Sequence, residues 1–115
     1  MSYDFPEEFL SIENGADTVR KLVAINITSV NAMTRAVLPQ MMERKRGAVV
    51  NVSSMSCLMP CPLLSVYAAS KSYVDTFTSN LGYEYSGKGI TVQCVIPGED
   101  SLIHAFEWLD YQAYF

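Results

Sequence analysis

The sequence predicts an α/β fold built around a pair of parallel strands. Two long segments with helical periodicity alternate with two short β-branched runs, in the order helix, strand, helix, strand. Both strand-like runs, residues 48–54 and 90–97, are apolar nearly throughout rather than alternating. Such runs are typical of strands buried on both faces of a parallel sheet whose connections are helical.

The first helix is expected over residues 18–44. Residues 1–14 are polar, carry Pro6 and are predicted to form a loop, and Asp17 is the expected N-cap. Pro39 lacks a backbone N–H, so we expect it to bend the helix near its end. Apolar side chains recur along this segment at helical spacing, namely Leu22, Ile25, Val30, Met33, Val37 and Met41.

The second helix is expected over residues 65–86, after a loop that contains Pro60 and Pro62. The glycine-rich turn "GKG", residues 87–89, ends it and leads into the second strand. The predicted elements all lie within residues 1–98, and residues 99–115 form a tail without clear turn signals. Within the tail, apolar residues predict at most a short helix; they are Leu102, Ile103, Phe106 and Leu109.

Composition narrows the classes of function. A chain of 115 residues suits one small domain, and 50% hydrophobic with only 17% charged residues excludes a disordered chain. So few charges indicate apolar surface that meets a partner. The net charge is −4, and the one basic cluster, "ERKR" at residues 43–46, is interpreted as a solvated helix end, so no nucleic-acid partner is predicted.

Cysteine spacing and hydropathy argue against a disulfide framework, a metal site and a membrane span. Cys57, Cys61 and Cys94 form no C-x-x-C pair, which argues against a disulfide framework and against a zinc site, so no metal is predicted. No apolar run has the length of a membrane span, and the acidic first residues do not form a signal peptide. From the residues alone, a cytoplasmic chain is expected.

The stretch "VYAASK" places Tyr67 and Lys71 four residues apart, on one face of the second helix. A free tyrosine is a poor acid or base at neutral pH, but a nearby ammonium group favours a phenolate. A tyrosine and lysine pair is therefore suited to proton exchange with a carbonyl or an alcohol. The alternative is that these are two polar residues on an ordinary helix.

Two more polar residues lie at informative positions. Ser54 ends the first strand, and ligands of open α/β sheets lie beyond the carboxyl ends of strands, so its hydroxyl could bind a substrate oxygen. Asn26 interrupts an apolar stretch of the first helix, and a buried amide must find partners. Asn26 therefore makes a local packing bond, distorts the helix, or belongs to a chain of water molecules that carries protons.

These motifs together resemble the short-chain dehydrogenase/reductase family. "AINITS", "VLPQMMERKRGAVVNVSS" and "YAASK" place Asn26, Ser54, Tyr67 and Lys71 on the positions of that family's Asn-Ser-Tyr-Lys tetrad. "PCPLLSVYAASKSYVDTFT" and "YEYSGKGITVQCVIPG" are similar to one subgroup, the 17-beta-hydroxysteroid dehydrogenases and very-long-chain 3-oxoacyl-CoA reductases of the endoplasmic reticulum. The resemblance covers residues 2–98 and implies part of a Rossmann-like, doubly wound parallel sheet.

The resemblance also implies an activity, namely NADP(H)-dependent reduction of a keto group on a lipid-like substrate, either a steroid or a 3-oxoacyl-CoA. Tyr67 would donate the proton, and Lys71 would favour the phenolate and bind the nicotinamide ribose. Ser54 would orient the substrate oxygen, and Asn26 would hold a water molecule of the proton relay. The two helices would form the interface of a homo-oligomer.

The expected cofactor contacts are Tyr67, Lys71, Pro97 and Gly98. The family's glycine-rich TGxxxGxG turn is absent from the sequence. The chain therefore resembles the central and C-terminal half of the domain, without its glycine-rich half. Two hypotheses follow, an active reductase or a truncated, inactive fragment that associates with a full-length relative; an unrelated small α/β binding domain would require the tetrad spacing to be accidental.

Overall fold

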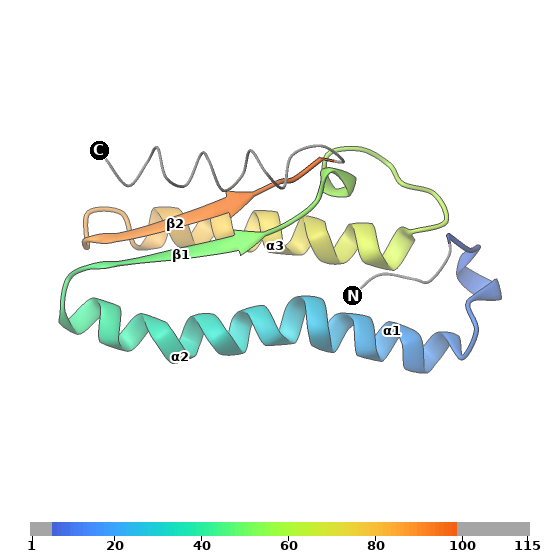
Figure 1. Cartoon of the computed structure of the whole chain (residues 1–115), viewed down its shortest axis with the longest axis horizontal. Helices are drawn as coiled ribbons and strands as arrows, with labels where there is room; N and C mark the ends of the chain where they lie inside the picture. Colours follow the sequence, from blue (N-terminus) through green and yellow to red (C-terminus); the bar gives the residue numbers. More distant parts are fainter. Residues whose placement is uncertain (1–5, 99–115) are drawn as a thin grey trace.

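The computed structural model describes residues 6–98, which form an α/β unit in the expected order (Figure 1). The helix and the apolar residues expected in the tail lie outside the described residues. The elements are a 3-10 turn Phe9–Ser11, helix α1 Gly15–Val23, a π-helical segment Ala24–Thr28, helix α2 Ser29–Glu43, strand β1 Gly47–Val52, a 3-10 turn Met55–Cys57, helix α3 Ser65–Glu84 and strand β2 Ile90–Val95.

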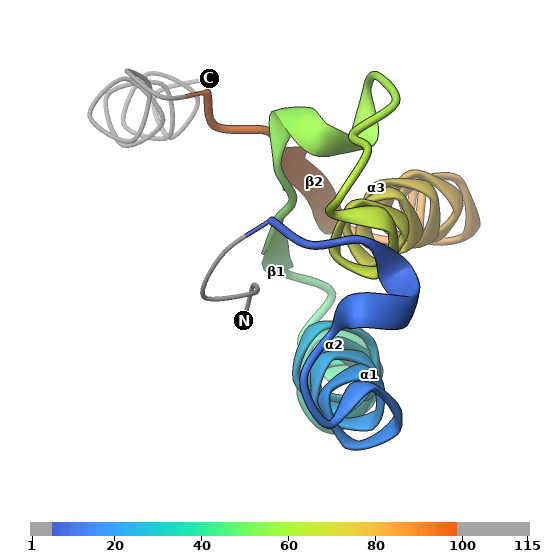
Figure 2. The same ribbon diagram turned by 90° about the vertical axis from the view of Figure 1, so that its right-hand side faces the viewer.

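The two strands pair in parallel, from Gly47 opposite Ile90 to Val52 opposite Val95. Helix α3 connects them, because parallel neighbours cannot be joined by a tight turn. Helix α3 and the rod formed by α1 and α2 lie on the same side of the strand pair (Figure 2). Because the strands are parallel, their carboxyl ends lie together at one end of the sheet. Ser54 comes two residues after the end of β1, at this end of the sheet.

The core lies between this side of the sheet and the helices. Leu38, Val49 and Ile90 are its buried centre, and Val37, Met41, Tyr85 and Val92 pack against them. Nearer the carboxyl ends of the strands, Leu22 and Val74 are fully buried. The apolar positions expected at helical spacing thus supply part of the core, while Ile25 and Met33 from the same set are exposed.

The prediction that both strands are buried on both faces is wrong for the residues described. Val49 is 9% exposed, whereas Val50 is 39% and Val52 is 52% exposed on the opposite face. Successive side chains of a strand point to opposite faces, and the described helices cover only one of them. A β-branched run shows that a segment favours a strand, but it does not show how many faces are covered.

The expected N-cap is also wrong. Helix α1 begins at Gly15 with Asn14 as its N-cap, in the left-handed conformation that asparagine tolerates. The Asn14 carbonyl accepts hydrogen bonds from the amides of Asp17 and Thr18. Asp17 lies in the first turn, where its carboxylate is 2.7 Å from Lys21 Nζ, and this hydrogen bond and charge lower the pKa of Asp17.

Other local expectations are refined. Helix α2 continues through Pro39 to Glu43, and part of the expected N-terminal loop forms the 3-10 turn Phe9–Ser11.

Among the described residues, no helix combines the length and the apolar character that crossing a bilayer requires.

Candidate active site

Tyr67 and Lys71 lie on the first turns of α3, beside the carboxyl end of β1. Lys71 Nζ lies 5.8 Å from the centre of the Tyr67 ring. It also donates a hydrogen bond of 3.2 Å to the carbonyl of Val52, the last residue of β1. The end of the strand therefore holds the ammonium group beside the Tyr67 ring, and the two side chains share one face of the helix as expected.

Ser54 follows β1 by two residues and is half-buried. Its backbone is extended, and its Oγ accepts a 3.3 Å hydrogen bond from the amide of Ser56. A hydroxyl that accepts a bond from a backbone amide retains its own hydrogen for another acceptor. Ser54 is thus able to donate to a substrate oxygen at the edge of the sheet.

The neighbouring Ser53 is a supporting residue that the sequence interpretation missed. It is buried, its Oγ donates to the carbonyl of Lys71 at 2.7 Å, and its amide donates to the carbonyl of Val95 at 2.8 Å. Ser53 therefore connects both strand ends to the helix that carries the tyrosine. Two successive serines at a strand end point to opposite sides, and this alternation could have predicted one structural and one accessible hydroxyl.

Asn26 lies in the π-helical segment, where the amide of Ser29 bonds to the carbonyl of Ala24, five residues back. Its side chain is buried, and Nδ2 donates to Ser70 Oγ at 3.0 Å. Ser70 Oγ donates in turn to the carbonyl of Tyr67 at 2.7 Å. Both alternatives for Asn26 that need no catalysis, a helix distortion and a packing bond, are therefore present, and π-bulges are also frequent at functional sites.

Ser70 is the second residue that the sequence interpretation missed. It is buried and links Asn26 to the backbone of Tyr67 across two helices. Its spacing gives a signal, because Ser70, Val74 and Thr78 recur every four residues and are all buried on one face of α3. Small hydroxyl residues on a buried helix face indicate close packing with hydrogen bonds to another element.

Pro97 and Gly98, the expected cofactor contacts after β2, are half-buried. They follow the strand end at the same edge of the sheet as Ser54, because the strands are parallel. Cys94 lies within β2, on the same strand face as Val92, which packs against the helices. Burial, reinforced by the carboxylate of Asp75, raises the pKa of Cys94 to about 11, so its thiol is a neutral packing group and not a nucleophile.

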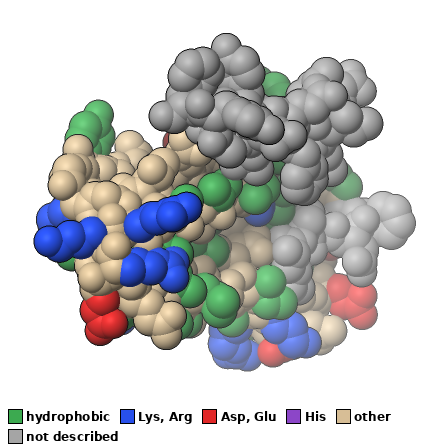
Figure 3. Space-filling view, turned by 60° about the vertical axis from the view of Figure 1, so that its left-hand side comes forward, with side chains coloured by type: hydrophobic (Ala, Val, Ile, Leu, Met, Phe, Trp, Pro, Cys, Tyr) green, Lys and Arg blue, Asp and Glu red, His purple; other side chains and the backbone are tan. Residues whose placement is uncertain are grey.

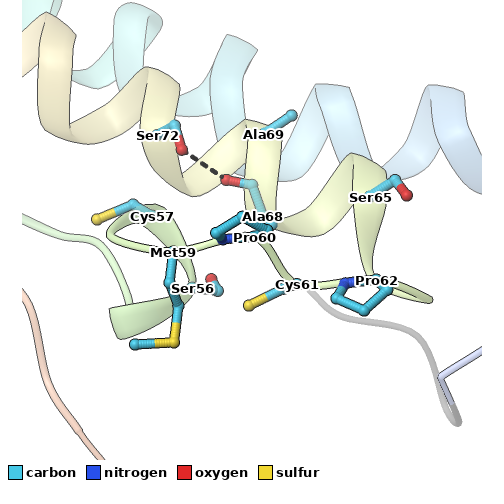
Figure 4. Close-up of a pocket in the computed structure, with 10 residues that line it drawn as sticks. All are labelled: Ser56, Cys57, Met59, Pro60, Cys61, Pro62, Ser65, Ala68, Ala69 and Ser72. Atoms are coloured by element: carbon cyan, nitrogen blue, oxygen red, sulfur yellow. Dashed lines mark hydrogen bonds between the residues drawn. The ribbon is translucent and has the colours of Figure 1, made fainter.

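A shallow hollow flanks this site, between the loop after β1 and the first turns of α3 (Figure 4). Ser72 Oγ donates to the carbonyl of Ala68 at its wall, at 3.0 Å. Tyr67 and Lys71 do not line it, since they lie on the adjacent face of the helix. The lining is Ser56, Cys57, Met59, Pro60, Cys61, Pro62, Ser65, Ala68, Ala69 and Ser72.

The family model described as short chain dehydrogenase matches residues 7–101. The chain belongs to the short chain dehydrogenase family. The very-long-chain 3-oxoacyl-CoA reductases of Bos taurus, Rattus norvegicus and Homo sapiens are 48%, 50% and 47% identical to it over 97 residues. These residues are 84% of this chain and 31% of each relative, so the chain spans about a third of their length.

Solved structures agree with the fold. The bulky-bulky ketone specific alcohol dehydrogenase from Comamonas testosteroni matches 96% of this chain and 47% of its own, with a TM-score of 0.84 at 24% identity, which supports the fold alone. A 3-oxoacyl-[acyl-carrier protein] reductase with bound NAD from Brucella melitensis gives a TM-score of 0.75 at 30% identity, over 85% of this chain and 38% of its own. The predicted fold class and family are thereby confirmed, and the roles of the four tetrad residues remain predictions.

Proposed function

We propose that this chain carries the proton-transfer part of an NADP(H)-dependent keto reductase that acts on 3-oxoacyl-CoA substrates. The observation that carries the proposal is the contact of Lys71 with both the Tyr67 ring and the end of β1, beside Ser54. The similarity to very-long-chain 3-oxoacyl-CoA reductases supports an acyl substrate over a 17-keto steroid. On the same resemblance, we place the complete enzyme at the endoplasmic reticulum.

Three side chains would act on one substrate oxygen. The Ser54 hydroxyl would hold the keto oxygen, and the Tyr67 hydroxyl would give it a proton while the carbonyl carbon takes a hydride, so that the keto group becomes an alcohol. Lys71 would stabilise the phenolate that Tyr67 leaves behind. Asn26, through Ser70, would hold the Tyr67 turn in place and complete the route by which the proton is replaced.

The residues present fit the nicotinamide end of the cofactor. Lys71 has three N–H donors, and one of them goes to the Val52 carbonyl, which leaves two for ribose hydroxyls. Pro97 and Gly98 flank the same sheet edge. The bound nicotinamide would supply the hydride. A glycine-rich turn for the pyrophosphate is absent from the sequence, so we expect the isolated chain to bind NADPH weakly or not at all, in a titration by calorimetry.

A chimera tests the catalytic assignment. The N-terminal part of the bovine relative is joined to this chain, and reduction of a 3-oxoacyl-CoA is followed by NADPH oxidation. Tyr67→Phe should lower kcat at least about 100-fold, because it removes the proton donor and keeps the ring. Tyr73→Phe is the matched control, since Tyr73 lies on the same helix and bonds to Asn31 on the exposed side. Equal activities of the two variants would refute the assignment.

A second candidate role is that of an inactive chain that associates with a partner. The partner would be another copy of this chain or a full-length relative. The observation that favours it is apolar exposure on Val50 and Val52 of the sheet and on Ile25 and Met33 of the helical rod. Unpaired strand edges also favour pairing between chains. Sedimentation across a dilution series should show self-association, and a monomer at high concentration would exclude it.

A further inference from the structure

Half of the basic residues gather at one end of the molecule, far from the tetrad. The chain has eight Lys and Arg residues. Arg44, Lys45 and Arg46 lie in the turn between α2 and β1, and Lys88 lies in the turn between α3 and β2. All four are exposed, and Figure 3 shows Lys and Arg side chains gathered on the end that comes forward. We refer to these four residues as the basic corner.

Backbone contacts hold the two turns of the basic corner together. Lys45 adopts a left-handed conformation with φ of 52°, and Gly89 has φ of 76°. An ideal Cβ at Gly89 would lie 2.0 Å from the Lys45 carbonyl oxygen, so only glycine permits this approach. The amide of Gly47 donates to the Gly89 carbonyl at 3.2 Å. Basic side chains from distant parts of the sequence are thus presented on one fixed platform.

None of the four residues of the basic corner forms an ion pair within the described residues, although the exposed carboxylates of Glu43 and Glu84 lie at the helix ends that lead into the two turns. The ion pairs found in residues 6–98 join Arg20 and Lys21 to Asp17, at the other end of the α1–α2 rod. Lys88 Nζ lies 4.9 Å from the centre of the Tyr85 ring, and Arg44 Nε donates to the Arg46 carbonyl at 2.7 Å. These contacts orient the side chains and leave their positive charge available to an external anion.

Apolar side chains accompany the charges. Met42 is 38% exposed and lines a shallow hollow together with Lys45 and Lys88. Tyr83, on the last turn of α3, is 83% exposed at the same end. Cations beside an exposed aromatic ring and a thioether form the pattern of a surface that lies at a membrane interface, where the apolar groups enter the headgroup layer.

The basic corner is separate from the proposed active site. It lies at the amino ends of both strands, whereas Ser54 and Tyr67 lie at the carboxyl end of β1. A strand of six residues spans roughly 20 Å, so a substrate held at the keto-reducing site would not explain these charges. The two ends of the sheet are therefore available to different ligands at the same time.

We propose that the basic corner docks on an anionic phospholipid surface. Lys and Arg near such a surface are attracted by its negative potential and bond to phosphate oxygens. A nucleic-acid partner fits less well, because proteins that bind nucleic acids carry an extended basic face and this chain has a net charge of −4. The neighbouring Met42 and Tyr83 also favour a lipid layer over a purely ionic partner.

Vesicle flotation of the 115-residue chain tests this proposal. Vesicles contain phosphatidylcholine alone or with an increasing fraction of phosphatidylserine. The variant Arg44→Gln/Arg46→Gln/Lys88→Gln removes three charges from the corner and leaves the left-handed Lys45 in place. Its matched control, Arg20→Gln/Lys21→Gln/Arg35→Gln, removes three charges elsewhere. Circular dichroism checks that both variants fold.

The native chain should float with phosphatidylserine vesicles, and high salt should release it. The corner variant should bind on the order of 100-fold more weakly, while the control should stay within a few fold of the native chain. Equal losses in both variants, equal binding to phosphatidylcholine alone, or no binding to phosphatidylserine would each overturn the proposal. Tighter binding to a short duplex DNA than to the vesicles would also overturn it.

Discussion

The two faces of the strand pair carry similar residues in opposite environments. On the covered face, Val49 and Val92 pack against the helices. On the open face, Val50 and Val52 are exposed within the described part of the chain. The same β-branched residue type therefore forms core on one face and exposed apolar surface on the other, and the placement of the described helices accounts for the difference.

Buried polar residues on the covered face restrict how the helices pack against the strands. Ser53, Ser70 and Thr78 are buried there, and each hydrogen-bonds across elements: Ser53 to Lys71, Ser70 with Asn26, and Thr78 with Asn51. An unsatisfied buried hydroxyl costs free energy, so these bonds permit few alternative packings. The covered face consequently fixes the geometry around Tyr67, whereas the open face exposes the apolar side chains of Val50 and Val52 within the described residues.

The largest expected difference between the faces is in the response to a buried charge. Val49→Lys should lower the free energy of unfolding by more than about 4 kcal/mol, since it places an unpaired ammonium group in the core. The neighbouring Val50→Lys points to the open face and should cost less than about 1 kcal/mol. Urea denaturation followed by circular dichroism measures both. Similar losses would show that the open face is covered in solution.

A smaller difference is expected for two asparagines of the helical rod. Asn26→Ala should lower the free energy of unfolding by about 2 kcal/mol, because the buried Ser70 hydroxyl loses its donor. Asn31→Ala removes exposed bonds to Tyr73 and should cost roughly 0.5 kcal/mol. If the two substitutions were equivalent in thermal or urea unfolding, the link between Asn26 and Ser70 would not contribute to the core.

The smallest effect concerns Cys94 on the covered face. Burial raises its pKa from 9.0 to about 11, so the folded chain holds the thiol proton more tightly than the unfolded chain. The resulting stability is complete below about pH 9 and is lost as the pH rises through about 11. At pH 8, iodoacetamide should modify Cys94 on the order of 100-fold more slowly in the folded chain than in urea.

Mass spectrometry resolves this modification residue by residue. Cys57 and Cys61 line the shallow hollow beside α3 and serve as internal references. A folded chain in which Cys94 reacts as quickly as it does in urea would mean that β2 does not stay packed against the helices.

The sequence by itself determined the order of the elements, the extent of α3, the pairing type of the strands and the family. Periodicity, β-branched runs and glycine turns act over a few neighbouring residues, so they can be recognised without the fold. The proximity of Tyr67 and Lys71 was predicted for the same reason, since they are one helical turn apart. The assignment of the tetrad depends instead on the resemblance to the family and stays a prediction.

Only the tertiary structure decided which strand face is covered, that Ser53 and Ser70 support the tyrosine, and that Asn26 lies in a π-helical segment. The basic run 43–46 was correctly predicted to be solvated. Its position beside Lys88 depends on the close approach of the Gly89 backbone to the Lys45 carbonyl. Each of these features requires contact between segments that are far apart in sequence. Their free energy comes from packing and burial in three dimensions, which local residue patterns do not encode.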